Sequence, residues 1–171
     1  SKEVDHTVVS TEDDDIFRLC EKYEKGTPIR RPKRFATDDA PVRDTIDHAI
    51  EIAEEQNDPF DVVCVVQPTS PLRNSDDIDK SLRQLFFNSA LSVNSVSKYL
   101  NPPQWAVTAG EDDYLKEYFD PEILWTDSIP RSQDIPDLWY PNGAVKAVYI
   151  DVWGEYKSTY TQKTTYYEMP P

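Results

Sequence analysis

Glycine is scarce in this chain of 171 residues, which contains only four. Dinucleotide-binding loops, P-loops and the nucleophile elbow of α/β-hydrolases each need glycines at fixed spacing, and the sequence matches none of these motifs. No apolar run approaches the roughly 18 residues of a membrane span. The N-terminal segment lacks the charged-then-apolar order of a signal peptide. We therefore expect a cytoplasmic protein that does not insert into membranes.

Cysteine, histidine and positive charge are also in short supply. Cys20 and Cys64 occupy apolar positions far apart in the sequence, so we expect two reduced thiols rather than a disulfide. His6 and His48 have no other metal-ligand residue at suitable spacing and are expected to be structural or solvated. The 18 Lys and Arg residues face 32 Asp and Glu, for a net charge of −14. This balance argues against nucleic acid as a partner.

The first 97 residues alternate between strand-like and helix-like segments. Runs rich in β-branched residues predict strands, and apolar residues spaced three and four apart predict helices between them. The expected strands are residues 6–10, 27–31, 60–67 and 89–97, with helices beginning near residues 11, 39 and 75. This order predicts an α/β fold with an open, mostly parallel sheet, in which ligands bind beyond the carboxyl ends of the strands.

Some of these elements carry more detailed expectations. The first helix should have one apolar face, formed by Ile16, Leu19, Cys20 and Tyr23. The 60–67 segment is continuously apolar, which is typical of a parallel strand covered on both faces. Ser75 is expected to cap the third helix.

After residue 97 the sequence changes character. Prolines and aromatic residues become frequent, helical periodicity fades, and four strand-like segments are joined by a long loop at residues 125–140. Tyr and Trp in this number suit a protein interface. We therefore divide the chain into an α/β part, residues 1–97, and a β-rich extension, residues 98–171, as parts of one domain.

"QPTSPLR", residues 67–73, directly follows the strand predicted at 60–67. Pro68 and Pro71 fix the backbone and remove two donors, so this loop has a defined shape. Gln67 and Arg73, together with two hydroxyls, could bind an anion or a sugar. Two interpretations stay open from the residues alone: a binding site, or a turn whose polar groups only satisfy the backbone.

Two further segments are rich in arginine. In "RRPKRFATDDAP" (30–41), Arg31 precedes a proline, which favours extended backbone and a projecting side chain. Its guanidinium could bind phosphate, carboxylate or a pyrimidine carbonyl, or lie on a solvated basic loop. "PRSQDIPDLWYPNGAV" (130–145) places Arg131 and Gln133 in a long loop, which is often functional.

"STEDDD", residues 10–15, clusters acids at the end of a predicted strand. Such a cluster could hold a metal ion. It could also simply stabilise the N-terminus of the following helix, where the helix dipole favours negative charge.

The segments "VVSTEDDDI", "RRPKRFATDDAP", "VVQPTSPLRNSDDID" and "PRSQDIPDLWYPNGAV", in this order, resemble the acylneuraminate cytidylyltransferases (CMP-sialic acid synthetases). The resemblance runs from about residue 8 to residue 171. It implies a Rossmann-like nucleotide-binding domain with a small extension that swaps across a homodimer. The implied reaction joins CTP to an acidic nine-carbon (nonulosonic) sugar, giving a CMP-sugar and pyrophosphate, with Mg²⁺ neutralising the phosphates.

The resemblance also implies roles for individual residues. Arg31 and the backbone of Ala40 would hold the cytosine, and Gln67 would contact the sugar near the nucleotide. Arg131 would pair with the sugar carboxylate, with Gln133 and Asn142 nearby. The residues expected to shape the loop after the 60–67 strand are Pro68, Pro71 and Arg73. No catalytic residue and no metal ligand is assigned within the chain.

The sequence departs from the family pattern in several places. Family members begin with a strand and a basic phosphate loop and continue to an Asp-x-Asp pair that binds Mg²⁺; neither is present in this sequence, so we expect an inactive fragment of the enzyme. Glu12, Trp105 and Lys146 replace the usual Asp, Lys and Tyr. The alternatives are a noncatalytic nucleotide- or sugar-binding homologue and a dimerisation module.

Overall fold

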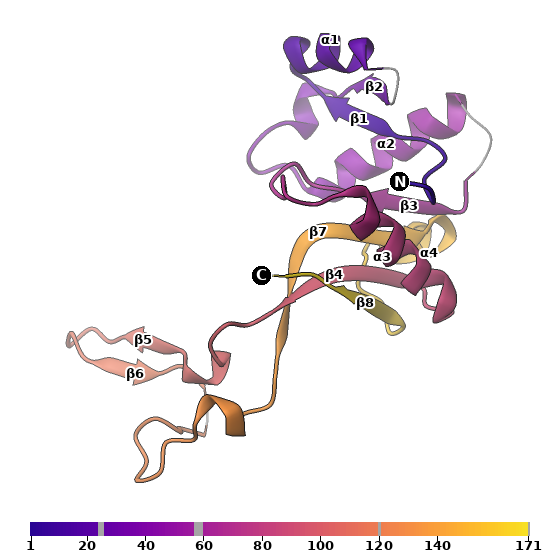
Figure 1. Ribbon diagram of the computed structural model, residues 1–171. Helices are drawn as coiled ribbons and strands as arrows, with labels where there is room; N and C mark the ends of the chain where they lie inside the picture. Colours follow the sequence, from indigo (N-terminus) through magenta and orange to yellow (C-terminus); the bar gives the residue numbers. More distant parts are fainter. Residues whose placement is uncertain (24–25, 57–59, 120, 171) are drawn as a thin grey trace. The chain divides into compact units, whose positions relative to one another are not determined.

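The computed structural model describes residues 1–23, 26–56, 60–119 and 121–170. The chain packs into two compact units, each built from segments that are not consecutive in the sequence (Figure 1). The first unit contains Ser1–Asn94 and Gly143–Tyr167, and the second contains Ser95–Asn142 and Glu168–Pro171. The division of the sequence into residues 1–97 and 98–171 as parts of one domain stays a prediction.

The first unit contains all four described α-helices, interspersed with strands. In chain order the elements are β1 (Val8–Thr11), α1 (Asp14–Lys22), β2 (Thr27–Arg30), the 3₁₀ turn η1 (Lys33–Phe35), α2 (Val42–Gln56), β3 (Val62–Val65), α3 (Ser75–Phe87), β4 (Ser92–Lys98), β7 (Trp139–Tyr149), α4 (Ile150–Tyr156) and β8 (Thr164–Glu168). The predicted α/β fold is thus confirmed. No described helix has the length and apolar content needed to cross a membrane.

The strands form separate sheets in place of the single, mostly parallel sheet that was predicted. β1 and β2 pair in parallel as a two-stranded sheet. A second sheet has the order β3-β7-β4-β8, in which β3 and β7 are antiparallel. The predicted parallel pairing therefore holds for β1 and β2, but not for β3 and β7. It failed for β3 because β7, which comes from much later in the chain, lies between β3 and β4.

The core of the first unit lies on both faces of the four-stranded sheet. On one face, α3 packs through Leu82 and Leu85 against Val93 of β4 and Ala147 of β7. On the other face, Ile46 and Ile50 of α2 and Trp153 of α4 pack around Val148 and Val63. Neighbouring residues of β3 and β7 therefore bury their side chains against different helices, as alternation along a strand requires.

The helices show two details that the sequence pattern did not reveal. Ile16 and Leu19 of α1, and Tyr23 directly after the helix, are exposed, and the helix buries no residue. The N-cap of α3 is Asn74, whose side chain accepts from the N–H groups of Asp76 and Asp77. The expected cap, Ser75, is the first residue of the helix.

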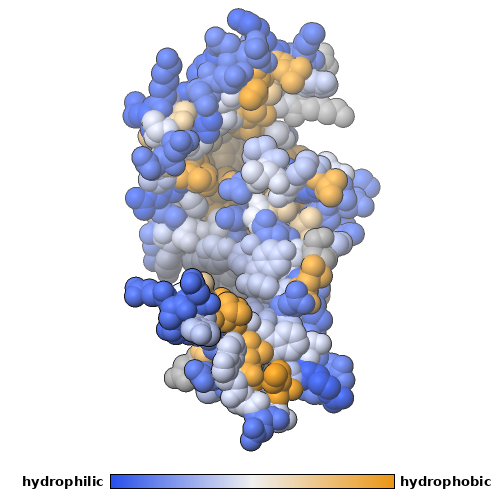
Figure 2. Space-filling model, turned by 90° about the vertical axis from the view of Figure 1, so that its left-hand side faces the viewer, coloured by the Kyte–Doolittle hydropathy of each residue, from blue (hydrophilic) through white to orange (hydrophobic). Residues whose placement is uncertain are grey.

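The second unit contains a short hairpin and two 3₁₀ turns. Its elements are η2 (Pro103–Trp105), β5 (Val107–Ala109), β6 (Leu115–Glu117) and η3 (Ser132–Asp134), in addition to parts of β4, β7 and β8. β5 and β6 pair in antiparallel register. The exposed large apolar residues of this unit include Tyr114, Leu115, Tyr118, Trp125 and Ile129. Figure 2 shows hydrophobic side chains gathered at the surface in its lower part.

Candidate functional site

The carboxyl ends of β1 and β2 coincide because the two strands are parallel and in register. Thr11 is the partner of Arg30, and the backbone N–H of Arg31 donates to the carbonyl of Thr11 at 3.0 Å. Glu12 and Arg31, which follow the two strands, are therefore neighbours. This edge is where parallel α/β sheets commonly bind ligands.

Arg31 and Glu12 form an ion pair at this edge. Nε of Arg31 donates to Oε2 of Glu12 at 2.9 Å, and Nη2 of Arg31 donates to the same oxygen. The two side chains are 27% and 38% exposed. The hydrogen bond from Arg31 is the largest cause that holds the pKa of Glu12 below its usual range. The carboxylate is therefore ionised at neutral pH.

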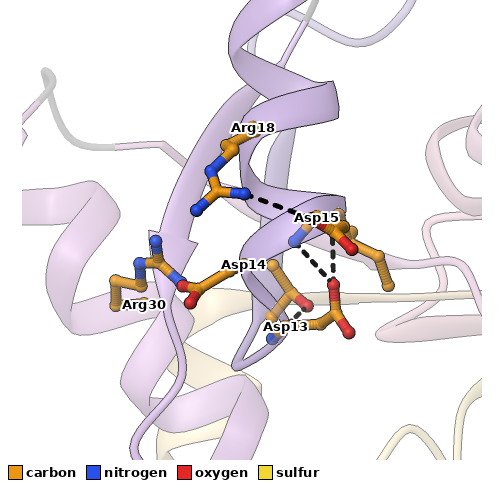
Figure 3. Close-up of polar contacts among 7 residues, drawn as sticks. Asp13, Asp14, Asp15, Arg18 and Arg30 are labelled. Carbon is orange, nitrogen blue, oxygen red and sulfur yellow. Dashed lines mark hydrogen bonds and ion pairs between the residues drawn. The ribbon is translucent and has the colours of Figure 1, made fainter.

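The three aspartates that follow Glu12 cap the start of α1 or form ion pairs there (Figure 3). Oδ1 of Asp13 accepts from the N–H groups of Asp15 and Ile16, both at 2.8 Å, and so caps the helix. Asp14 pairs with Arg30 at 2.5 Å, and Asp15 pairs with Arg18 at 3.2 Å. Over the described residues, no group of three or more His, Cys, Asp or Glu side chains could hold a metal ion. The helix-capping interpretation of this segment is thus the one that the structure supports.

The predicted base-binding backbone at Ala40 lies in the loop between η1 and α2. The N–H of Ala40 donates to the carbonyl of Thr37 at 3.0 Å, which closes a turn just before the helix. Within η1, just before this loop, the guanidinium of Arg34 lies 4.5 Å over the ring of Phe35. The role of Ala40 in holding a base stays a prediction.

The loop from Gln67 to Arg73 consists of two consecutive turns. The N–H of Ser70 donates to the carbonyl of Gln67 at 3.4 Å, and the N–H of Arg73 donates to the carbonyl of Ser70 at 3.2 Å. Pro68 and Pro71 each occupy the second position of a turn, where the fixed φ of proline is favoured. This spacing gives the loop a defined shape.

Arg73 ties this loop to β7. Its Nη1 donates to the carbonyl of Gln67 at 3.0 Å and to the carbonyl of Ala144 at 2.8 Å. Beside Ala144, Gly143 has φ of +74°, and a Cβ built there would lie 3.2 Å from Oε1 of Gln67. A side chain at position 143 would thus be strained and would crowd Gln67. The glycine allows the Gln67 side chain to lie against the backbone of β7.

In the second unit, Asn142 is held by two serines of β4. Ser95 donates from Oγ to Oδ1 of Asn142 at 2.5 Å, and Nδ2 of Asn142 donates to Oγ of Ser97 at 2.9 Å. Ser97 in turn donates to the carbonyl of Pro170 at 3.1 Å. These bonds fix the orientation of the side-chain amide of Asn142. This is one of the residues that the resemblance places near the sugar.

Arg131 and Gln133 lie at η3, also in the second unit. Arg131 is exposed and pairs with Asp134, with Nε 2.9 Å from Oδ2 and Nη2 3.3 Å from Oδ1. Gln133 lines a half-open cavity of about 240 Å³. Lys98 and Asp137 also line this cavity and form an ion pair of 2.6 Å. Leu100 and Leu138 contribute aliphatic side chains to the same cavity, so its walls are partly apolar and partly charged.

In each unit, residues that were predicted to bind a ligand contact other residues that the sequence pattern did not indicate. The unforeseen partners are Glu12 for Arg31, Gly143 for Gln67, Asp134 for Arg131, and Ser95 and Ser97 for Asn142. The three-residue spacing of Arg131 and Asp134 is a signal that could have been found. The other partners depend on strand pairing and on contacts between distant segments.

The chain is similar in sequence to several cytidylyltransferases. A pseudaminic acid cytidylyltransferase of Campylobacter jejuni is 24% identical over 166 residues, covering 97% of this chain and 69% of the relative. N-acylneuraminate cytidylyltransferase B of Danio rerio is 28% identical over 173 residues, covering 99% of this chain and 38% of the relative. A Streptococcus agalactiae N-acylneuraminate cytidylyltransferase is 26% identical and covers 94% and 37%, respectively.

In fold, the chain is similar to the solved structure of a CMP:2-keto-3-deoxy-manno-octonic acid synthetase complexed with CTP. The TM-score is 0.63 at 14% sequence identity, covering 98% of this chain and 73% of the other. No family model matches the sequence. The similarity in sequence along nearly all of the chain agrees with the order of the four segments found in the sequence. Along nearly all of its length, the chain is thus similar to the cytidylyltransferases that act on pseudaminic and N-acylneuraminic acids.

Proposed function

We propose that the protein carrying this chain is a cytidylyltransferase that activates a nonulosonic, sialic-acid-like sugar. In this reaction the anomeric hydroxyl oxygen of the sugar bonds to the α-phosphorus of CTP. The bond from that phosphorus to the bridging oxygen breaks, pyrophosphate leaves, and the hydroxyl proton is released. The observation that carries the proposal is the similarity to pseudaminic and N-acylneuraminic acid cytidylyltransferases along 94–99% of the chain.

The nucleotide part of the site is assigned to the first unit. Arg31 lies at the carboxyl end of a parallel strand, partly exposed and with a planar group of donors. Such a fork suits the carbonyl and ring nitrogen at the edge of a pyrimidine. The backbone of Ala40, in the loop that follows, is the second group assigned to the cytosine.

The sugar part of the site is assigned to Gln67, Arg131, Gln133 and Asn142. Gln67 is carried by a loop whose shape the two proline turns and Arg73 maintain. Arg131 offers a guanidinium, the group best matched to a carboxylate such as that of a nonulosonic acid. Amide side chains can donate to and accept from sugar hydroxyls, which suits Gln133 and Asn142.

Mg²⁺ is proposed to accompany CTP. This ion keeps several waters and commonly binds nucleotide phosphates together with only one or two carboxylates. The described residues contain no metal-binding group, so we assign no ligand among them and route no step of the reaction through the ion. Its contribution would be to neutralise charge on the phosphates.

A second copy of the chain is proposed as partner, giving a homodimer, and the cytoplasm is proposed as the location. The exposed aromatic and aliphatic residues of the second unit support the first proposal, because such residues are enriched at interfaces. Cys20 and Cys64 are not joined in a disulfide, which is usual in a reducing compartment.

The test of the nucleotide site is calorimetric titration of the full chain with CMP. Replacing Arg31 with alanine should weaken binding about tenfold, which corresponds to about 1.4 kcal/mol. The matched control is Arg18→Ala, which removes an exposed arginine that pairs with an acid on α1. Equal CMP affinity in the wild type and in Arg31→Ala would contradict the assignment.

The test of the reaction is pyrophosphate release from CTP and Mg²⁺ with a panel of pseudaminic, legionaminic and N-acylneuraminic acids. The protein that carries this chain should release pyrophosphate with at least one of them. CMP binding without any release would favour the noncatalytic binding homologue instead. Absence of both, with self-association retained, would favour a dimerisation module.

A further inference from the structure

The ion pair between Arg31 and Glu12 differs from the neighbouring pair between Arg30 and Asp14. Two nitrogens of Arg31 donate to one oxygen of Glu12, whereas Arg30 contacts Asp14 through Nη1 alone. Arg31 is 27% exposed, compared with 50% for Arg30. The guanidinium of Arg30 also lies 3.8 Å over the ring of Phe17. Both pairs join residues near the ends of the same two strands. The Arg30–Asp14 pair therefore serves as the reference against which the Arg31–Glu12 pair is compared.

The contact with Glu12 leaves a particular edge of the Arg31 guanidinium for a ligand. A guanidinium has five N–H donors in one plane. Glu12 takes the edge formed by Nε and Nη2. The edge formed by the two terminal nitrogens is then directed away from the carboxylate, and two parallel donors on it match two acceptors side by side on a flat ring.

The same contact changes the charge that a ligand meets. An ionised Glu12 lies in hydrogen-bond contact with Arg31, so the pair as a whole is neutral. A neutral pair attracts a phosphate less than a lone guanidinium would, but it still offers hydrogen bonds to uncharged acceptors. Arg31 paired in this way is thus suited to read a base edge in preference to a phosphate.

We propose that Glu12 is a positioning residue that orients Arg31 toward the cytosine edge and neutralises it, so that the site selects the base rather than the phosphate. This inference rests on the proposed function, in which Arg31 binds the nucleotide. Glu12 itself does not contact the ligand. Its two effects, on orientation and on charge, are separable by substitution.

The experiment measures the affinities of the full chain for CMP, UMP and inorganic phosphate by calorimetry. Glu12→Gln removes the charge and keeps the length of the side chain. We expect the preference for CMP over UMP to fall about fivefold and binding of inorganic phosphate to strengthen, because Arg31 is then an uncompensated cation. Glu12→Asp keeps the carboxylate and should retain more of the preference for CMP than Glu12→Gln does.

Asp14→Asn is the matched control, because it removes one carboxylate beside the same strand ends from an arginine that is not assigned to the ligand. It should leave the CMP and UMP affinities and their ratio unchanged. If the ion pair only holds β1 and β2 together, Glu12→Gln should lower the thermal midpoint of unfolding without changing the CMP-to-UMP ratio. That result would overturn the inference.

The outcome also separates this inference from the proposed function. If Arg31→Ala weakens CMP binding while Glu12→Gln changes neither the ratio nor phosphate binding, the nucleotide site stands and the role of Glu12 is wrong. If Arg31→Ala itself leaves CMP binding unchanged, the nucleotide assignment fails first, and the role of Glu12 fails with it.

Discussion

Each of the two arginines assigned to ligands already has an acidic partner. Arg31 pairs with Glu12, and Arg131 pairs with Asp134. In a chain with a net charge of −14, such partners are easily supplied. A guanidinium held by a carboxylate is restricted in orientation before the ligand arrives, which lowers the entropy that binding must overcome.

At the residue scale, we predict that Arg131→Ala raises the KM for the acidic sugar about tenfold and leaves CMP affinity unchanged. The reason is that the guanidinium is proposed to pair with the sugar carboxylate, an interaction worth roughly 1.5–3 kcal/mol. Pyrophosphate release over a range of sugar concentrations measures it. Lys116→Ala is the control, because Lys116 is also exposed in the second unit and pairs locally with Asp112. An unchanged KM in Arg131→Ala would refute the assignment.

A second prediction at this scale concerns the two thiols. Burial raises the pKa of Cys64 to about 11, and the positive charge of Arg73 only partly offsets this effect. At pH 8 only about 0.1% of such a thiol is thiolate, the form that reacts with alkylating agents. We expect iodoacetamide to modify Cys20 first and Cys64 only after unfolding.

Peptide mapping by mass spectrometry after short exposure distinguishes the two sites. Cys64→Ser and Cys20→Ser variants assign the signals. Equal modification of both cysteines in the folded chain would show that the environment of Cys64 on β3 is not the one described.

At the scale of elements, α2 and α4 are joined by Asp47. Its Oδ1 accepts from Nε1 of Trp153 at 2.7 Å and from Nζ of Lys157 at 2.8 Å. Burial acts to raise the pKa of Asp47, but the hydrogen bonds from Lys157 and Trp153 outweigh it and hold the pKa below its usual range. The carboxylate therefore stabilises the helix pair while it is ionised.

We predict that Asp47→Ala lowers the free energy of unfolding by about 1–2 kcal/mol at pH 7, because the indole N–H of Trp153 loses its acceptor. A group whose pKa is lowered by folding contributes stability above its unfolded pKa of about 3.9 and loses it as the pH falls through the lower folded value. The difference between wild type and variant in urea unfolding should therefore shrink as the pH falls below about 3.9. A difference that stays constant with pH would contradict this.

Local patterns were enough to predict the order of elements up to β4, but not their partners. The β-branched runs gave β1 to β4 to within a few residues, and the spacing of apolar residues gave α1, α2 and α3. The insertion of β7 between β3 and β4 depends on a pairing between residues 80 or more apart, such as Cys64 with Ala147. No periodicity within either segment carries that information.

Other errors have equally local causes. α4 was missed because it follows β7 without a break, at Ile150, and is only seven residues long. The apolar face predicted for α1 carries Ile16 and Leu19, which are about half exposed. Periodicity indicates that a helix is amphipathic but does not show what covers it. In the candidate site, motif order only singled out the arginines and Gln67 as candidates, whereas the contacts that orient them came from the fold.

At the scale of the whole molecule, the exposed large apolar residues bear on self-association. Single exposed apolar side chains are normal, but a group of aromatic and aliphatic residues within one unit marks an interaction surface. The β5–β6 hairpin alone exposes Val107 and Leu115, with Tyr114 and Tyr118 beside them.

We predict that the chain self-associates through this hairpin and that Leu115→Lys and Tyr118→Asp each shift it toward monomer. A charge placed in an apolar interface must be desolvated without a partner, which is strongly unfavourable. Sedimentation equilibrium at several concentrations measures the effect. Phe87→Glu is the control, since Phe87 is 88% exposed at the end of α3 in the first unit. Association that persists in both hairpin variants would place the interface elsewhere.

The hydrogen bond between Ser95 and Asn142 has a consequence for how the protein could be dissected. These residues are the first and last of the long segment of the second unit, so the two ends of that segment meet. Because Ser95 and Asn142 are in contact, residues 96–141 could be deleted and a two-residue turn could join the two ends. Cutting the chain at residue 97 would instead remove β7 from the middle of its sheet. An excised-loop version is thus the rational way to ask what the first unit binds by itself.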